Sequence, residues 1–378
     1  MAKTSKLTAD IQPVYQPLLD DLLAAFEGGS IKPGEWLLGE NKLSRQYGIG
    51  HISVRKALSM LEQQGYIRRI RGRGTQVLER KSSLSEILVL SLKPKAVADI
   101  SENKLYLPVI NRVRKLGAAE DIITKLVYHD WLEDVDPQAY WASFNFKPDT
   151  GVMLIGETEE SCLPALSDIQ GPVVQVDHRI PGLKIDSVEP DNAACGRNMV
   201  EHLAGLGHRK LIYLSWYKEK ELNPRRLEGV FEGLEKAGIP ELAVPPVLCS
   251  IGTGDGFTKS AYDALRELLK NKASFTGIMA NNAGFAEEAI RALTDAGLRV
   301  PEDVSVVCVS SRVVSDQRGR PLTYVDVDME RLADEALHRL LYRFKNRGEP
   351  DREIAVPVRL VPGATCMPVN KDASALQR

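Results

Sequence analysis

The sequence lacks several features that define large classes of proteins. Its 378 residues contain 5 cysteines, which lie far apart and form no CxxC pair. We therefore expect reduced thiols, with neither a disulfide framework nor a zinc site. No run of about 18 apolar residues occurs, and the first residues lack an apolar signal-peptide core. These absences predict a soluble, cytoplasmic protein with no membrane partner.

Motifs of common enzymes are missing as well. The chain has no GxSxG, HExxH or P-loop sequence, and its 6 histidines show no nucleophile–base arrangement. The glycine-rich segment 252–256 lacks the Gly-Lys-Ser/Thr ending of a phosphate-binding loop. We therefore expect no enzyme activity, no catalytic residue, no cofactor and no metal site.

Basic and acidic residues nearly balance over the whole chain but not along it. The 49 Lys/Arg and 51 Asp/Glu leave a net charge of −2, which excludes a disordered polyelectrolyte. Residues 1–80 hold 12 of the basic and 8 of the acidic residues, so they carry a net charge of +4 and the remainder carries −6. A basic N-terminal segment on an acidic body favours contact with phosphate groups, although a solvated surface helix would also explain the charge.

The first 80 residues show helical patterns followed by a hairpin. A short helix is expected over 40–47, and another over 51–64 places Val54, Leu58 and Leu61 at i, i+4 and i+7. Two short helices around a glycine-containing turn are typical of a helix-turn-helix, whose second helix enters the major groove of DNA. Two strands then flank a Gly/Arg-rich tip, which predicts a wing that reaches phosphates or the minor groove.

This segment closely resembles the winged-helix DNA-binding domain of the GntR family. The likeness covers about residues 13–79 and rests on motifs in the family's order and spacing: KPGE at 32–35, LSRQY at 43–47, SVRKAL at 53–58, LEQQGYI at 61–67 and RGRGT at 71–75. The resemblance implies binding to double-stranded DNA through residues of the two helices and the wing tip. These residues are Arg55, His51, Ser53, Arg45, Lys42, Asn41, Arg71, Gly72 and Arg73.

The segment departs from the family's pattern at two positions. Gly39-Glu40-Asn41 stands where the family usually has Ser-Glu-Arg, and Gly50-His51 stands where it has Ser/Thr-Arg. Both positions commonly contact DNA in the family, so the resemblance leaves the operator sequence open. His51 is expected to lie in the groove and not on a metal, because no second His or Cys lies at ligand spacing.

The rest of the chain alternates between strands and helices. Residues 1–12 and 367–378 are expected to be tails and 80–85 a polar linker. Apolar runs between residues 86 and 366 are separated by helical stretches, which predicts an α/β fold with a parallel sheet covered on both faces. Nearly 300 residues favour two such lobes over one.

This body resembles the effector domain of the LacI/GalR family, which is itself similar to periplasmic sugar-binding proteins. The likeness extends over about residues 86–366 and rests on GLGHRK at 205–210, RLEG at 226–229, GIMANN at 277–282, AGLRVPEDVSVV at 296–307 and PLTYV at 321–325. It implies two doubly wound lobes joined by three crossovers, with a small molecule bound between them. We expect lobe 1 to comprise 86–185 and 325–350, and lobe 2 to comprise 186–322 and 352–366.

Candidate effector-binding residues lie near strand ends, where open α/β lobes bind ligands. Arg226 and Asn281 match family positions that contact ligand, and Asp177 ends a predicted strand. Ser310 stands where the family usually has an aspartate, so a modified or acidic ligand is considered beside a neutral sugar. The full set is Arg226, Asn281, Asp177, Ser310, Trp216, Phe257 and Tyr106. Each aromatic residue could equally serve the core or the surface.

Together, the two parts are similar to regulators of the arabinose-repressor type. The resemblance implies a ligand-responsive transcriptional regulator, expected to repress carbohydrate-metabolism genes as a homodimer on a pseudo-palindromic operator. A sugar-binding or structural module without a DNA function is the alternative, and the N-terminal motifs count against it. A fusion to an aminotransferase-like body would need more residues than remain after the head.

Overall fold

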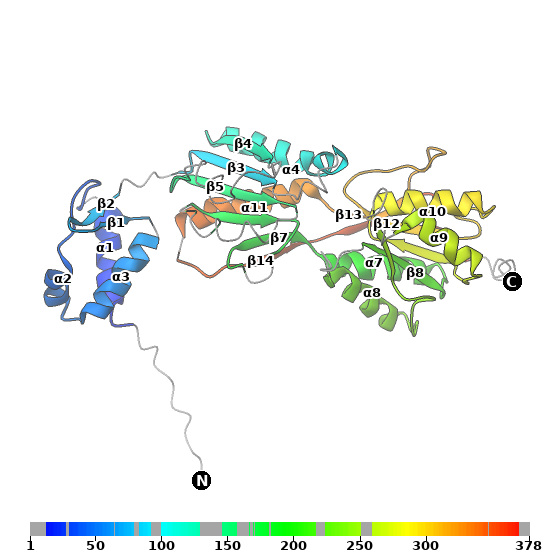
Figure 1. Cartoon of the computed structure of the whole chain (residues 1–378), viewed down its shortest axis with the longest axis horizontal. Coiled ribbons are helices and arrows are strands. Elements are labelled where there is room, and N and C mark those ends of the chain that lie inside the picture. Colours follow the sequence, from blue (N-terminus) through cyan, green and yellow to red (C-terminus); the bar gives the residue numbers. More distant parts are fainter. Residues whose placement is uncertain are drawn as a thin grey trace, which may run out of the picture.

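The structure is a computed structural model of the chain. It describes residues 13–27, 30–63, 65–78, 83–91, 100–128, 146–156, 166, 169, 171–180, 183–216, 224–250, 259–346 and 348–369. The predicted tail 1–12 and the candidate Phe257 lie outside these residues. Figure 1 shows three folded parts in a row, with the N-terminal head at one end and the two lobes following it.

The N-terminal head is a winged helix. Its elements are α1 (Gln16–Glu27), α2 (Glu40–Tyr47), α3 (His51–Gln63), β1 (Ile67–Ile70) and β2 (Gly74–Val77). Leu18, Val54 and Leu61 are completely buried in a core of its own, as the helical spacing predicts. Gly48 ends α2 in the left-handed conformation at φ 63°, which turns the chain sharply into α3.

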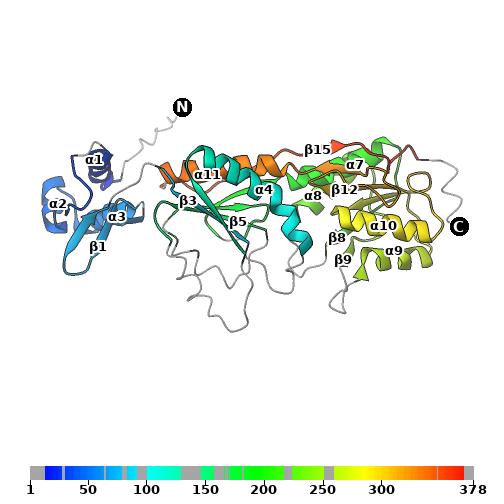
Figure 2. The ribbon, with the colours of Figure 1, turned by 90° about the horizontal axis from the view of Figure 1, so that it is seen from above.

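Lobe 1 is built on a six-stranded parallel sheet in the order β14-β7-β6-β5-β3-β4. Its elements are β3 (Glu86–Ser91), α4 (Ile100–Ala119), β4 (Ile123–Tyr128), β5 (Thr150–Ile155), β6 (Val173–Val176), β7 (Asp186–Pro190), α11 (Met329–Lys345) and β14 (Glu353–Val356). Every residue of β5 is buried, as expected of a central parallel strand. Helix α11 packs on this sheet and against α4 (Figure 2).

A buried ion pair fastens α11 to β7. Arg339 reaches Asp186 with Nε at 2.7 Å from Oδ2, and both side chains are at most 5% exposed. Arg343 and the backbone N–H of Arg352 contact the same carboxylate. Because one buried carboxylate contacts three residues from two other segments, Asp186 joins the start of β7 to α11 and to the chain entering β14.

Lobe 2 has a seven-stranded sheet in the order β10-β9-β8-β11-β12-β13-β15, parallel except for β15. Its elements are α7 (Asn192–Gly205), β8 (Leu211–Trp216), α8 (Pro224–Lys236), β9 (Val247–Ser250), β10 (Lys259–Ser260), α9 (Ala261–Lys270), β11 (Gly277–Ala280), α10 (Ala283–Asp295), β12 (Ser305–Ser310), β13 (Thr323–Asp326) and β15 (Arg359–Val361). Along β11, Met279 packs with α7 and α8, whereas Ile278 and Ala280 pack with α9 and α10. Helices therefore cover both faces, as predicted.

The chain passes between the lobes three times, but the lobe boundaries differ from those expected. Segments 186–190 and 353–356 belong to the sheet of lobe 1, not lobe 2, and 323–326 belongs to the sheet of lobe 2. The chain therefore crosses after β7, after β13 and after β14, and not before these strands as expected. Apolar runs identify a strand but do not show which sheet it joins, because that depends on partners distant in sequence.

The predicted linker 80–85 and the predicted C-terminal tail 367–378 both include residues that belong to the lobes. Leu84 is buried, and the backbone N–H of Ser85 donates to the carbonyl of Asp149, so the last two residues of the predicted linker belong to lobe 1. At the other end, Val369 donates from its backbone to Leu206, which attaches the start of the predicted C-terminal tail to lobe 2.

Candidate functional site

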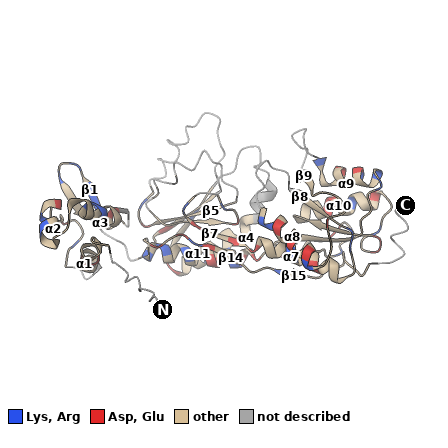
Figure 3. Ribbon diagram, turned by 90° about the horizontal axis from the view of Figure 1, so that it is seen from below, with Lys and Arg blue, Asp and Glu red and all other residues tan. Residues whose placement is uncertain are grey.

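The head exposes most of the residues that the sequence assigns to DNA binding. His51 and Arg55 lie on α3 and are exposed, whereas Ser53 is half-buried. Asn41, Lys42 and Arg45 are exposed on α2, and Arg71, Gly72 and Arg73 are exposed at the wing tip. Figure 3 shows basic residues on α2 and α3 of this head. The head thus presents cations on the helix and wing that can meet a phosphate backbone.

One ion pair links the two helices of the helix-turn-helix. Arg55 Nε lies 2.8 Å from Glu40 Oε2, and the exposed fractions of the two side chains are 67% and 32%. The hydrogen bond to Glu40, followed by its charge, raises the pKa of Arg55. The bond engages the Nε edge of the guanidinium, so the outer Nη groups remain available to a base or a phosphate.

The wing is held to α3 by a second ion pair. Glu62 accepts from Arg69 at its backbone N–H and at Nε, both at 2.7 Å. Strands β1 and β2 pair antiparallel from Ile67↔Val77 to Ile70↔Gly74. Gly72 turns at φ 77°, a conformation that L side chains rarely adopt, and this lets the chain reverse at the tip.

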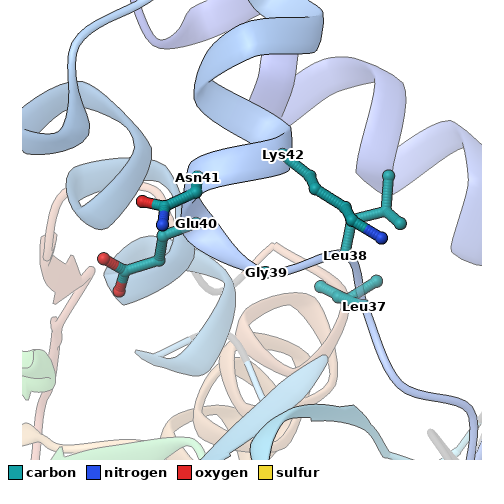
Figure 4. Close-up of a pocket in the computed structure, with 6 residues that line it drawn as sticks. All are labelled: Leu37, Leu38, Gly39, Glu40, Asn41 and Lys42. Carbon is teal, nitrogen blue, oxygen red and sulfur yellow. The ribbon is translucent and has the colours of Figure 1, made fainter.

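An open hollow of about 590 Å³ lies where α2 begins, lined by residues 37–42. Figure 4 shows Glu40 and Asn41 on one side of it, with Leu37, Leu38 and Lys42 on the other. Gly39 caps α2 without a side-chain hydrogen bond. This hollow belongs to the DNA-binding head and contains none of the predicted effector residues.

In lobe 2, Arg226 is the centre of a hydrogen-bond network. Its Nη1 donates to the backbone carbonyl and to Oδ1 of Asn281, at 2.9 and 2.8 Å, and its Nη2 donates to Asn192 Oδ1 at 2.6 Å. Tyr213 donates its hydroxyl to Asn281 Oδ1 at 3.0 Å. The network therefore joins the starts of α7 and α8 to the end of β11, which is where parallel sheets bind ligands.

Two glycines place Arg226 beside Asn192. A Cβ on Gly229 would lie 2.0 Å from the carbonyl oxygen of Ala193, and one on Gly196 would lie 2.2 Å from that of Arg226. Only glycine allows α7 and α8 to approach this closely. The RLEG motif thus combines the arginine of this network with the glycine that positions its helix.

In lobe 1, Asp177 lies directly after β6 and adopts a positive φ of 72°. Tyr106 from α4 donates its hydroxyl to Asp177 Oδ2 at 2.7 Å, and His178 Nδ1 lies 3.6 Å from the same atom. Gly156 lies directly under the Tyr106 ring, since an added Cβ would be 3.0 Å from it. Two predicted effector residues, Tyr106 and Asp177, are therefore in contact.

Electrostatics connect the groups of the two lobes. Burial alone would raise the pKa of Asp177, but hydrogen bonds and charge from His178, the Tyr106 hydroxyl and the Arg226 charge together lower it. Asp177 is therefore held as a carboxylate, and the charge of Arg226 on lobe 2 is one of the causes. Burial raises the pKa of Glu189 on β7, and Asp177 adds to this shift while Arg225 opposes it.

Two donors of this network are buried without a partner. They are Arg226 Nε and Asn192 Nδ2, for which the described residues supply no acceptor. Buried donors without acceptors are costly, and binding sites commonly contain such groups. The arrangement suits a ligand with several acceptor oxygens.

The remaining predicted effector residues are placed differently. Ser310 ends β12, but its hydroxyl donates to the carbonyl of Arg312 at 2.8 Å, so it closes a local turn. Trp216 ends β8, and its side chain lies outside the described part, as does all of Phe257. Asn192, Tyr213 and His178 were not among the predicted residues, although they contact Arg226, Asn281 and Asp177. His178 and Asn192 lie just after strands β6 and β7, so a position near a strand end was the available signal.

Glu353 forms two ion pairs outside this network, and one of them joins the lobes. Glu353 on β14 accepts from Arg225 of α8 and from Arg179 of lobe 1, both at 2.7 Å. The hydrogen bond from Arg225, together with the charges of Arg179 and Arg225, lowers the pKa of Glu353 despite partial burial. Adjacent arginines on one helix thus contact different groups: Arg226 the inner network and Arg225 the outer carboxylate.

The described cysteines Cys195, Cys249, Cys308 and Cys366 are free thiols. Burial raises the pKa of Cys195 to about 11 and that of Cys249 to about 12, so both stay protonated near neutral pH. Within the described ranges, no cluster of His, Cys, Asp or Glu could hold a metal ion. No described helix has the length and apolar character needed to cross a bilayer.

Two family descriptions match separate parts of the chain. Residues 12–77 match the bacterial regulatory proteins of the gntR family, and residues 200–366 match the periplasmic binding protein-like domain. The chain therefore contains one segment that matches a GntR-type regulatory domain and another that matches a periplasmic binding protein-like domain.

Individual relatives are regulators as well. The chain is 29% identical over 214 residues to the HTH-type transcriptional regulator CelR of Thermobifida fusca, covering 56% of this chain and 60% of that protein. It is 23% identical over 308 residues to the arabinose metabolism transcriptional repressor of Geobacillus stearothermophilus, covering 78% and 81%. The first match thus spans less than two thirds of that relative.

Solved structures share the fold. A CelR–cellobiose complex matches with a TM-score of 0.61 and 19% identity, covering 87% of this chain and all of that chain. The lac repressor dimer bound to operator matches with a TM-score of 0.58 and 20% identity, covering 76% and 95%. At these identities the likeness establishes the two-lobed fold.

Proposed function

We propose that this protein is a transcriptional repressor whose affinity for DNA is controlled by a small molecule bound between its two lobes. The observation that carries the proposal is the network centred on Arg226. It gathers polar side chains at the ends of lobe 2 elements, carries a charge that lowers the pKa of Asp177 of lobe 1, and leaves two buried donors without acceptors. A ligand that touches both lobes stabilises one relative lobe position.

The proposed effector is a sugar or a sugar derivative. Arg226 and Asn192 offer donors, while Asp177 offers a carboxylate acceptor, which suits the paired hydroxyl groups of a carbohydrate. The CelR relative of known structure holds cellobiose. Because Ser310 replaces the family's aspartate and its hydroxyl is engaged in a turn, a sugar acid or sugar phosphate belongs in the same test.

The proposed DNA target is a pseudo-palindromic operator bound by a homodimer in the cytoplasm. One winged helix spans a single half-site, and two related copies bind two half-sites around a two-fold axis. Linkage then couples the two ligands: an effector that changes DNA affinity must have its own affinity changed by DNA to the same degree. The protein acts through binding, and no catalytic step is part of the proposal.

Selection of duplexes from a random library by the purified full chain tests the DNA half of this proposal. A thermal-shift screen of sugars, sugar acids and sugar phosphates then finds the effector, and gel retardation with and without it measures the coupling. We expect one class of ligand both to stabilise the protein and to change its affinity for the selected duplex. A stabilising ligand that leaves DNA affinity unchanged contradicts the proposal.

A further inference from the structure

Ile52, the second residue of α3, is 86% exposed. Among the large hydrophobic side chains of the described residues, none is more exposed; Val313 follows at 70%. The rest of α3 follows the expected pattern, since Val54, Leu58 and Leu61 are at most 1% exposed. An isoleucine so fully in water contributes nothing to the core of the head, so its place on this helix calls for a different explanation.

The helical period places Ile52 opposite the core. Leu61 lies nine residues further on, which corresponds to about half a turn around the helix. Arg55 and Lys56, three and four residues after Ile52, are exposed on the same side as Ile52. The apolar side chain therefore lies within a basic face, at the N-terminal end of the second helix of the helix-turn-helix.

This setting restricts what can cover Ile52. An apolar protein surface or a second copy of the head would have to bury Arg55 and Lys56, and two copies would bring like charges together. DNA avoids both costs, because its phosphates and guanine edges accept hydrogen bonds from Arg55 and Lys56. The major groove also offers one apolar group, the C5-methyl of thymine.

We propose that Ile52 contacts the C5-methyl group of a thymine in each half-site and so determines the base at that position. The inference rests on the proposed function as a DNA-binding regulator. The N-terminal residues of a recognition helix contact base edges, and an aliphatic side chain discriminates for thymine through its methyl group. Arg55, one turn away on the same face, would then contact a neighbouring base pair or phosphate.

Replacing thymine by uracil tests this directly, because the change removes only the methyl group. The best duplex selected by the full chain is resynthesised with uracil at one thymine position at a time, in both half-sites. For the wild-type protein, we expect one position to weaken binding by roughly three- to tenfold, as for one lost buried methyl group. All other positions should change little.

The variant Ile52→Ala should bind the thymine duplex more weakly than the wild type by a similar factor. Its affinities for the thymine and the uracil duplex should be equal. The affinity of Ile52→Val for the thymine duplex should lie between those of the wild type and Ile52→Ala. Val313→Ala, which also truncates an exposed aliphatic residue but in lobe 2, should behave as wild type. The thermal midpoint of Ile52→Ala should equal that of the wild type, because the side chain packs against no core residue.

Four outcomes overturn the inference. A selected duplex whose affinity is insensitive to uracil at every position, or equal sensitivity in Ile52→Ala, shows that Ile52 does not contact the methyl group. A change of oligomeric state in Ile52→Ala shows that the residue contacts another protein copy. If no duplex is selected at all, the proposed DNA-binding function itself fails, and this inference fails with it.

Discussion

Glu40 at the start of α2 and Arg55 on α3 form an ion pair of 2.8 Å across the helix-turn-helix. The resemblance to the GntR family implies that Arg55 contacts DNA. The ion pair leaves room for such a contact, because the carboxylate occupies the Nε edge and leaves the outer edge of the guanidinium. Glu40 therefore acts as a positioning residue for Arg55 in the proposed DNA complex.

Replacing Glu40 by Ala should reduce the discrimination between a selected duplex and a scrambled one. The loss frees Arg55 to adopt other rotamers, which weakens specific contacts, and it removes a negative charge near phosphate, which favours nonspecific binding. We expect the ratio of the two affinities to fall by roughly tenfold. Gel retardation at fixed salt with both duplexes measures this ratio. An unchanged ratio contradicts the positioning role.

Replacing Arg55 by Ala should reduce specific DNA binding more strongly than the Glu40 change. The variant loses a contact from α3 to a base or a phosphate. We therefore expect its affinity for the selected duplex to decrease by roughly ten- to a hundredfold or more. Effector binding and dimerisation should be unchanged, because the head is a separate unit with its own core. Arg318→Ala, at an exposed position in lobe 2, is the matched control. Normal retardation by the Arg55 variant at moderate salt rejects the assignment.

The elements of the fold follow from local patterns in the sequence. The helices expected over 40–47 and 51–64 are observed as Glu40–Tyr47 and His51–Gln63, because their apolar residues recur at helical spacing. The strand order does not follow from such patterns. The short strands 186–190 and 353–356 lie side by side although they are far apart in sequence, and only their pairing assigns them to lobe 1.

The network centred on Arg226 was also predictable only in part, because it depends on contacts between residues distant in sequence. Arg226, Asn281 and Asp177 were identified from a family resemblance and from their places near strand ends, and Tyr106 was a further candidate from the first lobe. Asn192 joins them only because Gly196 and Gly229 allow α7 and α8 to touch. A contact that depends on the distance between two helices leaves no pattern in the local sequence. Ser310 shows the converse, since its position was predicted for a ligand but its hydroxyl serves a turn.

The stability of the protein should increase with pH near neutrality because of two histidines, the buried His208 and the half-buried His202. Burial lowers the pKa of His208, against the opposing hydrogen bond with the Met367 carbonyl, and it also lowers the pKa of His202. The unfolded chain takes up protons near pH 6.5, whereas these folded imidazoles do so only at lower pH. The stabilisation is therefore complete above about pH 6.5 and is lost as the pH falls through the folded values, by at most about 1.4 kcal/mol per pH unit for each histidine.

Urea unfolding between pH 5.5 and 7.5 measures this dependence. His208→Gln removes one of the two titrating groups, so the slope of the unfolding free energy against pH should decrease. His338→Gln on α11 is the control, because His338 is exposed and its ring remains in water. A slope that is the same in the His208 variant and in the wild type contradicts the assignment.

Replacing Arg226 by Ala should weaken effector binding while leaving DNA binding without effector intact. The guanidinium holds Asn281 and Asn192 in place and is expected to donate to the ligand, so truncation removes charge-assisted bonds in a partly desolvated site. We expect the effector affinity to fall by roughly ten- to a hundredfold. Calorimetry with the ligand found in the thermal-shift screen, together with gel retardation, measures both quantities.

Its neighbour Arg225 provides a matched control on the same helix turn. Arg225→Ala also removes one arginine from α8, but its partner is the exposed carboxylate of Glu353 and not the inner network. Because exposed ion pairs contribute little, this variant should lose much less effector affinity than the Arg226 variant. Equal losses in both variants would mean that the charge of α8, and not the inner network, governs binding. If Arg226→Ala binds the effector with wild-type affinity, the residue is only a structural link between α7, α8 and β11. If the variant loses both effector binding and DNA binding, it is misfolded.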